Sequence, residues 1–157
     1  MNTSAPYSAD KIAKYFIWKA SQEGKGITNK KLQKLLYYAQ AWNLAIKNTP
    51  LFKEDIEAWV HGPAIRTIYD QYKSFGFGPI NEKINTRELG DLPKDALLDE
   101  IWGIYGKFDA DYLEMLSHSE TPWQNAREGI DEGVPSTNII SLETMKDYYK
   151  ERLQHAS

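Results

Sequence analysis

The sequence contains no cysteine, which excludes disulfide bonds, a thiolate nucleophile and a cysteine-ligated metal. Its three histidines, His61, His118 and His155, lie far apart along the chain and match no metal-ligand or nucleophile spacing. A glycine-rich phosphate loop, an HExxH pair and an EF-hand pattern are also absent from the sequence. We therefore predict no metal, no cofactor and no enzymatic activity.

Long apolar runs are missing as well. No stretch approaches the ~18 uninterrupted apolar residues that indicate a membrane-spanning helix. Residues 1–6 have neither a basic start nor an apolar run, so we expect no signal peptide. These absences predict a cytoplasmic protein with no membrane partner.

Aromatic residues, by contrast, are abundant. The chain of 157 residues has ten tyrosines and five tryptophans, and aromatic residues make up 13% of it. This content favours either a tightly packed core or a surface that binds a partner. The length indicates one domain with a real core, which we place at residues 8–157, after a loose tail of residues 1–7.

The charges are distributed unevenly. Residues 1–49 hold eight lysines and two acidic residues, a local charge of +6. Residues 50–157 hold eleven basic and twenty acidic residues, a local charge of −9, and the two add to the net charge of −3. Either the two segments pack beside each other and cancel, or the protein has two faces of opposite sign, each suited to a charged partner.

The spacing of apolar residues predicts a mainly α-helical protein. Helical periods follow capping residues such as Ser8 and Thr28, and the longest predicted helix spans Asn29–Lys47. Residues 56–60 alternate as a strand does, and we expect them to pair with residues 138–140. The predicted fold is a compact single-domain helical bundle with at most a small two- or three-stranded β element.

Gly62 and Pro63 change the geometry after this strand. Glycine can cap a helix and proline suits the first helical position, so the pattern predicts a helix over residues 63–72. One interpretation is a corner that only defines the fold. The functional interpretation is that free N–H groups at the helix start, with His61 and Arg66 nearby, form a polar recognition point.

Three lysines, Lys30, Lys31 and Lys34, crowd the first turns of the longest helix, where positive charge opposes the helix dipole. A solvated lysine face is the simpler interpretation, and a nearby acid or an anionic partner is the other. Together with Tyr37 and Tyr38, these lysines also have the composition of a surface that contacts phosphates and bases. The negative net charge argues against nucleic acid as the partner.

Three motifs stand in a specific order along the chain. They are KLQKLLYYAQ at residues 31–40, EAWVHGPAI at residues 57–65 followed by Tyr69, and TPW at residues 121–123. Over most of the chain, these motifs resemble the Panacea domain of the SocA-like antitoxin family, also called phage-associated GepA-like proteins. Val60-His61 is a departure, because the family often has Tyr or Lys-Tyr before Gly-Pro.

The resemblance implies a non-catalytic antitoxin of a bacterial or phage toxin–antitoxin system, which neutralises a cognate toxin by direct protein–protein contact. One family member acts instead as a proteolytic adaptor that delivers its toxin to the ClpXP protease, so ClpXP is an alternative partner. A nucleic-acid-binding regulator that uses the surface of residues 30–38 is the other alternative.

Interface hot spots favour Tyr, Trp and Arg, so we expect the toxin-binding surface on the flanks of the longest helix and on the helix after Gly62. The candidate partner-binding residues are Lys30, Lys34, Tyr37, Tyr38, Arg66 and Tyr69. The motif residues expected to be structural are Lys31, Leu35, Trp59, Gly62, Pro63, Pro122 and Trp123. The corresponding test combines Tyr38→Ala with Arg66→Ala, which should abolish neutralisation without unfolding the protein.

Overall fold

Seven α-helices and one two-stranded antiparallel sheet form the computed structural model, which describes residues 5–155. The predicted fold class, a mainly helical domain with a small β element, is confirmed. The elements are α1 (Ala9–Gln22), α2 (Asn29–Lys47), β1 (Glu57–Trp59), β2 (Gly62–Ala64), α3 (Arg66–Tyr72), the 3-10 turns η1 (Lys73–Phe75), η2 (Thr86–Leu89) and η3 (Leu92–Lys94), α4 (Ala96–Tyr105), α5 (Ala110–His118), α6 (Thr121–Ala126) and α7 (Leu142–His155). Within the described residues, none of these helices has both the length and the apolar character to span a membrane.

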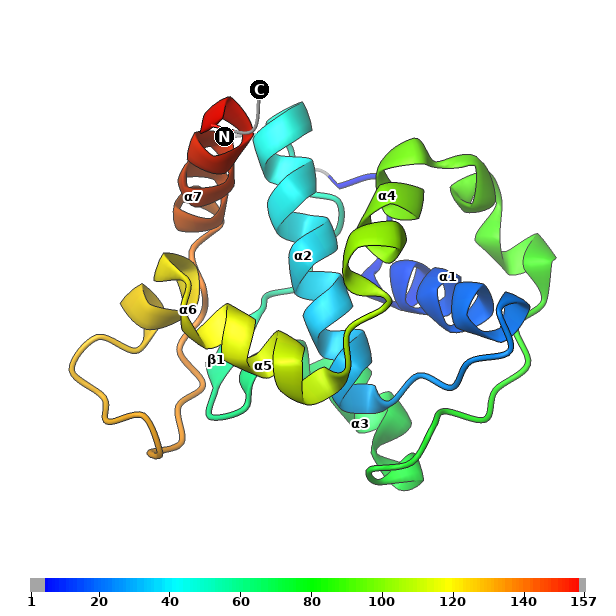
Figure 1. Ribbon diagram of the computed structural model, residues 1–157, viewed down its shortest axis with the longest axis horizontal. Helices are drawn as coiled ribbons and strands as arrows, with labels where there is room; N and C mark the ends of the chain where they lie inside the picture. The colour runs from blue at the N-terminus through cyan, green and yellow to red at the C-terminus, as the bar shows by residue number, and fades with distance from the viewer. Residues whose placement is uncertain (1–4, 156–157) are drawn as a thin grey trace.

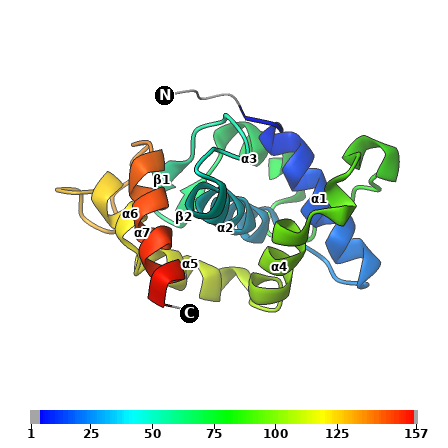
Figure 2. The same cartoon turned by 90° about the horizontal axis from the view of Figure 1, so that it is seen from above.

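Helix α2 is the axis of the fold. It runs through the middle of the molecule (Figure 1), and α1, α3, α4, α5 and α7 contact it from several sides, as Figure 2 shows from above. The apolar stripe that the periodicity assigns to the core, from Leu32 to Ala39, is fully buried. Residues on its other faces are buried too, because aromatic and amide side chains alternate with the aliphatic ones. The helix is therefore stabilised by burial on nearly all sides.

Amide side chains on α2 hold the segment that leads to the hairpin. Gln40 Oε1 accepts from the Leu51 N–H at 2.7 Å, and its amide donates to the Phe52 carbonyl at 2.8 Å. Gln33 Oε1 accepts from the Ile65 N–H at 2.7 Å, immediately before α3 begins. Buried backbone groups outside regular elements need such partners. The glutamines of the first motif thus position the strands and α3 against α2.

Strands β1 and β2 form a hairpin, and the prediction that a helix begins at Pro63 is wrong. Pro63 belongs to β2 and pairs with Ala58, and α3 starts at Arg66. In a two-residue hairpin this second pair makes no ladder hydrogen bonds, so the missing proline N–H costs nothing there. Gly62 has φ +104°, which is not helical, so the chain turns back as a strand before the helix starts.

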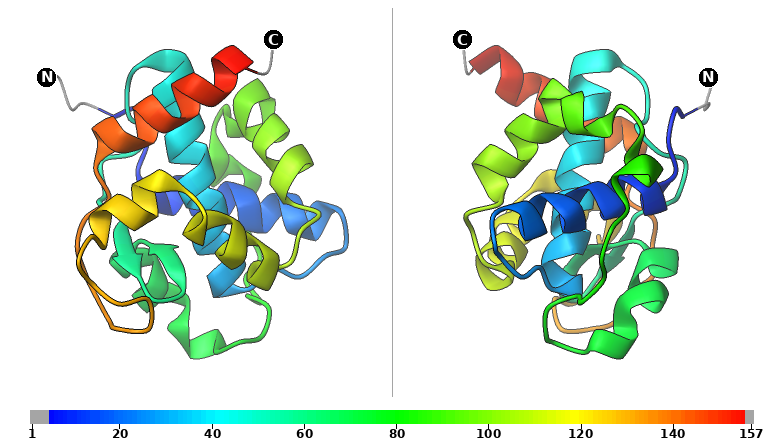
Figure 3. Two further views of the ribbon diagram at one scale, coloured as in Figure 1. Left: turned by 60° about the vertical axis from the view of Figure 1, so that its left-hand side comes forward. Right: turned by 90° about the vertical axis from the view of Figure 1, so that its right-hand side faces the viewer.

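The segment after α6 returns to β1, as predicted. Ile139 forms an antiparallel bridge with Glu57, and backbone hydrogen bonds of 2.8 Å flank it on both sides. Figure 3 shows this segment running beside the hairpin. Arg127 is buried and donates to the Ala58 carbonyl at 3.0 Å and to three carbonyls of its own loop. The pairing predicted between the two segments is therefore confirmed, in the form of a single bridge.

The packed domain begins before Ser8. Residues 1–4 of the expected tail lie outside the described residues. Tyr7 forms a parallel bridge with Phe52, and its N–H donates to the Leu51 carbonyl at 3.2 Å. Ser8 then caps α1, as its position predicts, by accepting from the Lys11 N–H.

Candidate functional site

A groove of about 540 Å³ opens where the first half of α2 meets the hairpin, α3 with its following turn, and the start of α5. These elements come together at the lower end of α2 in Figure 1. The lining residues that matter below are Lys30, Lys34, Trp59, Gly62, Tyr69 and Phe77. The groove thus gathers three of the six predicted partner-binding residues, from α2 and α3, with two motif residues from the hairpin.

Trp59 and Tyr69 form the aromatic wall of the groove. Their rings meet edge to face with centroids 5.1 Å apart. The indole N–H donates to Glu57 at 2.8 Å, and the Arg66 guanidinium lies over the indole, 5.0 Å from the ring centroid, while it donates to the same carboxylate. Tyr69 is 40% exposed and Phe77 is fully exposed at the rim. A binding partner would therefore meet an aromatic surface whose side chains are already held in place.

The three lysines at the start of α2 all have partners within the chain, but the partners differ in kind. Lys30 forms ion pairs with Asp111 at 2.8 Å and Glu114 at 2.5 Å. Burial alone would lower the pKa of Lys30, but its bonds to these acids outweigh burial and raise it. Lys31 donates to the Gly106 carbonyl at 2.5 Å. A nearby acid was one of the two explanations for positive charge at the start of this helix, and for Lys30 such acids are present.

Lys34 differs from both. It is only 2% exposed, and its ammonium donates to the Pro63 carbonyl at 3.1 Å. Among residues 5–155, this ammonium forms no ion pair, and Glu114, whose charge does act on it, pairs with Lys30. Burial, and then repulsion from Lys30, lower the pKa of Lys34 from 10.5 to about 7. The prediction that Lys34 lies on an exposed flank of α2 is wrong, although the residue does line the groove.

Gly62 makes room for this buried lysine. A Cβ at Gly62 would lie 2.6 Å from Lys34 Cε and 3.0 Å from Ser117 Oγ. Its φ of +104° adds a second reason for glycine, since a side chain there is strained. The first and second motifs are therefore one structural unit, in which Gly62 accommodates the lysine and the Pro63 carbonyl binds its ammonium.

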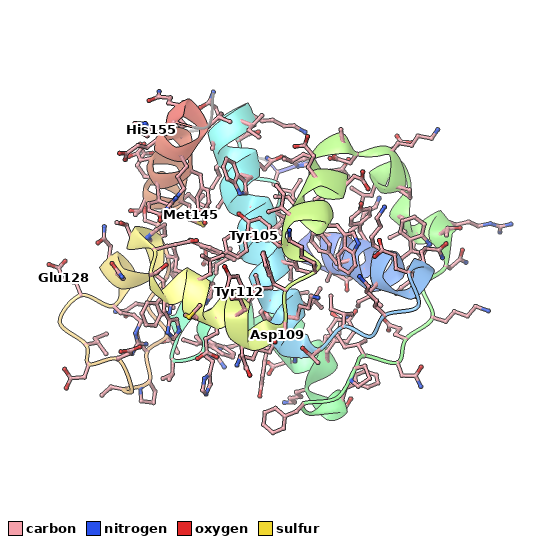
Figure 4. The ribbon with its side chains drawn as sticks, viewed as in Figure 1. Tyr105, Asp109, Tyr112, Glu128, Met145 and His155 are labelled. Carbon is pink, nitrogen blue, oxygen red and sulfur yellow. The ribbon has the colours of Figure 1, made fainter. Side chains whose placement is uncertain are left out.

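Tyr37 and Tyr38 lie in the core, so the prediction that they flank an exposed face is wrong. Both are fully buried and donate to Glu120, at 2.9 Å and 3.1 Å. Tyr149 of α7 donates to the same carboxylate. Tyr38 also stacks on Tyr105 with ring centroids 4.0 Å apart, and Figure 4 shows Tyr105 beside α2. These tyrosines therefore join α2 to α4 and α7.

The basic and aromatic surface predicted for residues 30–38 is consequently not formed. Its aromatic rings are in the core, Lys34 is buried, and Lys30 is paired with acids of α5. The prediction treated α2 as a helix with one buried stripe and one solvent face. A helix at the centre of the domain has no such solvent face.

Glu120 is a key residue that sequence reasoning missed. Burial raises its pKa, although its bonds to the tyrosine hydroxyls favour the ionised form. Its position offered one signal, since it directly precedes the third motif and is the N-cap residue of α6. The side chain makes no capping bond there and instead accepts from α2 and α7.

The remaining motif residues support the hairpin and the core. Leu35, Pro122 and Trp123 are buried. The Trp123 indole donates to the Trp59 carbonyl at 2.9 Å and stacks on His118 with ring centroids 3.9 Å apart. Among residues 5–155, no group of His, Asp and Glu side chains is arranged to hold a metal ion.

The fold and the groove together define a small helical domain that presents an aromatic and cationic groove. The chain belongs to the family described as "Antitoxin SocA-like, Panacea domain", whose model matches residues 32–124. It is 30% identical to "Antitoxin SocA" of Caulobacter vibrioides (strain NA1000 / CB15N) over 169 aligned residues, which cover 97% of this chain and 86% of the relative. No solved structure matches the chain significantly.

Proposed function

We propose that this protein is the antitoxin of a bacterial or phage toxin–antitoxin pair and that it neutralises its toxin in the cytoplasm by direct binding. The observation that carries this proposal is its similarity, over nearly its full length, to a relative named as an antitoxin. Membership of the SocA-like family agrees with it.

The chemistry of the groove supports binding to a protein. Its rim exposes Tyr69 and Phe77, and Arg66 lies beside it on the Trp59 ring. Tyr, Trp and Arg are the residues enriched in interface hot spots. Since Trp59 and Arg66 are already held by Glu57, they lose little freedom when a partner binds.

Co-expression with the protein encoded next to this gene tests the proposal. We expect the neighbouring protein to arrest growth alone, and this chain to restore growth and to co-purify with it. Arg66→Ala combined with Tyr69→Ala should reduce rescue while leaving the circular dichroism unchanged. Glu128→Ala is the matched control, because Glu128 is exposed in the loop after α6, away from the groove (Figure 4). A harmless neighbour, or rescue without any complex, would contradict direct neutralisation.

The same cells distinguish inhibition from delivery to ClpXP. If the chain acts by direct inhibition, as proposed, rescue persists without ClpXP and the toxin accumulates in an inactive complex. If the chain is an adaptor, rescue is lost without ClpXP, and the half-life of the toxin depends on the protease. The expectation that the chain is not an enzyme stays a prediction, and incubation of the purified protein with nucleotides, RNA and peptides tests it.

A further inference from the structure

We infer that the groove binds a carboxylate of the toxin, carried beside an apolar side chain, and that Lys34 is the residue that receives it. The inference rests on the proposed function, because it names the chemistry by which the same groove would recognise its partner. It assigns a binding role to Lys34, a residue whose burial would by itself suggest a purely structural one.

The first reason is the unmatched hydrogen-bonding capacity of Lys34. A lysine ammonium has three N–H donors, and in the described residues this one makes a single hydrogen bond, to the Pro63 carbonyl. Lys30, one turn earlier, is paired with Asp111 and Glu114. A buried ammonium without an acid is unfavourable. A carboxylate brought by a partner would supply the missing charge and acceptors.

The second reason is the charge of the groove. Lys30, Lys34 and Lys73 line it, and among residues 5–155 Lys30 pairs with Asp111 and Glu114 while Lys73 pairs with Asp70. Lys34 is the remaining lysine of the lining, without an acid partner, and its ammonium form complements an anion. The ammonium sits on a flexible four-carbon stem, so it can turn toward a ligand in the groove without backbone movement. Gly62 presents no side chain that would block this rotation.

The third reason is the neighbouring aromatic wall. Trp59 and Tyr69 line the same groove as Lys34, and Phe77 stands exposed at its rim. An apolar side chain of the partner would bury against these rings while a carboxylate nearby in its sequence binds the ammonium. This combination favours an acidic and apolar protein segment over a nucleic acid, whose phosphates are repeated and fully solvated.

A small probe tests the site without the toxin. N-acetyl-phenylalanine has a carboxylate and an aromatic ring, and N-acetyl-phenylalaninamide is the matched ligand without the charge. We expect the acid to bind the full-length protein with a Kd on the order of 1 mM, to shift the NMR signal of Lys34 Cε, and to bind at least about tenfold more tightly than the amide. Lys34→Met should abolish this preference, whereas Lys53→Met, at an exposed lysine outside the groove, should preserve it.

Three results with the small probe alone would overturn the inference. They are equal binding of the acid and the amide, binding of the acid that leaves Lys34 unperturbed, and an unchanged preference in Lys34→Met. Binding of a duplex oligonucleotide that displaces the acid from Lys34 would also overturn it, in favour of a nucleic-acid site.

Direct binding to the toxin completes the test. Lys34→Met should weaken toxin binding by about tenfold to a hundredfold, and Lys53→Met should leave it unchanged. If wild-type protein fails to bind the neighbouring toxin, the proposed function fails, and the small probe still decides whether Lys34 receives a carboxylate. If wild-type protein binds the toxin and Lys34→Met binds it equally well, the function stands and this inference is wrong.

Discussion

Two buried polar sites, one turn apart on α2, differ in the partners that the chain supplies. At the middle of the helix, Tyr37 and Tyr38 donate to Glu120, and Tyr149 of α7 donates to the same carboxylate. One turn earlier, Lys34 is also buried but has one carbonyl partner and no acid partner among the described residues. The tyrosine hydroxyls thus have an acceptor within the chain, whereas Lys34 lacks an acid partner and lines a groove.

The contrast distinguishes a cluster that stabilises the fold from the site to which we assign partner binding. A buried polar network with every member satisfied rigidifies a core, whereas a partly satisfied one costs stability. The Glu120 cluster joins α2, α6 and α7 and borders no part of the groove. The Lys34 site lies in the groove lining, at a position where burial lowers the pKa of the amine to about 7. Substitutions at the two sites should therefore change stability in opposite directions.

The largest effect is expected at Glu120. Glu120→Ala leaves three buried hydroxyls without their shared acceptor, and we expect the free energy of unfolding to fall by about 3–5 kcal/mol. Urea denaturation followed by circular dichroism measures it. Glu120→Gln retains one acceptor oxygen, so its loss should be smaller, and Glu128→Ala should cost nothing measurable. An unchanged free energy of unfolding in Glu120→Ala would show that the tyrosine hydroxyls form hydrogen bonds with other partners.

The same reasoning replaces the test that pairs Tyr38→Ala with Arg66→Ala. Because Tyr38 is buried, stacked on Tyr105 and bonded to Glu120, its removal should unfold the protein, and loss of function would then say nothing about binding. Arg66→Ala combined with Tyr69→Ala still tests whether this surface binds the toxin, since both residues lie at the surface around the groove.

The next largest effect, opposite in sign, is expected at Lys34. Lys34→Met removes a buried ammonium that lacks an acid, so at pH 6 we expect the free energy of unfolding to rise by about 1–4 kcal/mol. The same variant should bind the toxin poorly, which would make Lys34 a residue that trades stability for function. A strongly destabilised Lys34→Met would instead place Lys34 with Glu120, as part of the structural core.

The pH dependence of this difference gives a separate measurement. The pKa of Lys34 is about 7 in the folded protein and 10.5 when unperturbed. Below pH 7 both states are protonated and the wild type carries the full cost of the buried charge, whereas between pH 7 and 10.5 the unfolded state binds the extra proton. Wild-type stability should therefore rise relative to Lys34→Met in this window, by at most about 1.4 kcal/mol per pH unit.

The comparison with the variant matters because other ionisable groups surround Lys34. Lys30 lies on the same helix, Glu114 and His118 face it from α5, and His61 is in the hairpin turn. These groups remain in Lys34→Met, so subtracting its unfolding free energy from that of the wild type at each pH leaves the contribution of Lys34 and of its electrostatic coupling to these neighbours. A difference that does not change with pH would mean that the folded and unfolded pKa values of Lys34 are equal.

A smaller loss is expected at Gly62. Gly62→Ala puts a Cβ 2.6 Å from Lys34 Cε and forces a non-glycine residue to φ +104°, so we expect a loss of about 1–3 kcal/mol. Combination with Lys34→Ala removes the collision with Lys34 but keeps the close contact with Ser117 and the backbone strain. Thermal unfolding of the double-mutant cycle should therefore show coupling of at least about 0.5 kcal/mol. Strict additivity would show that the two residues do not contact each other.

Local patterns predicted the helices well and the position of α2 poorly. Ser8 and Thr28 cap α1 and α2 as their positions indicate, because capping depends on neighbours a few residues away. The exposure of Tyr37 and Tyr38 depends on α7, which begins about a hundred residues later and covers them. No spacing within α2 carries that information.

The groove likewise depends on contacts between distant segments, which local sequence patterns do not contain. The sequence indicated that Lys34, Trp59 and Gly62 belong to motifs, but only the fold reveals that they line one groove. The helix predicted from Pro63 failed because proline suits both a first helical turn and a hairpin position without ladder bonds. Residues 62–64 form a strand because they pair with Glu57–Trp59 across a two-residue turn. The Gly-Pro dipeptide alone does not predict this pairing.

The smallest effect on stability is expected at Phe77, at the rim of the groove. Phe77 is fully exposed and lines the groove beside Gly76. Because it buries nothing in the free protein, Phe77→Ser should change the free energy of unfolding by less than about 0.5 kcal/mol. A large exposed ring at the rim of a groove is typical of an interface anchor, so the same variant should weaken toxin binding by about tenfold. Isothermal titration with the purified toxin measures the affinity, and the exposed Lys53→Met serves as the control. Unchanged affinity would restrict the binding surface to the inner groove around Trp59 and Lys34, whereas a loss of stability would show that Phe77 packs against the chain after all.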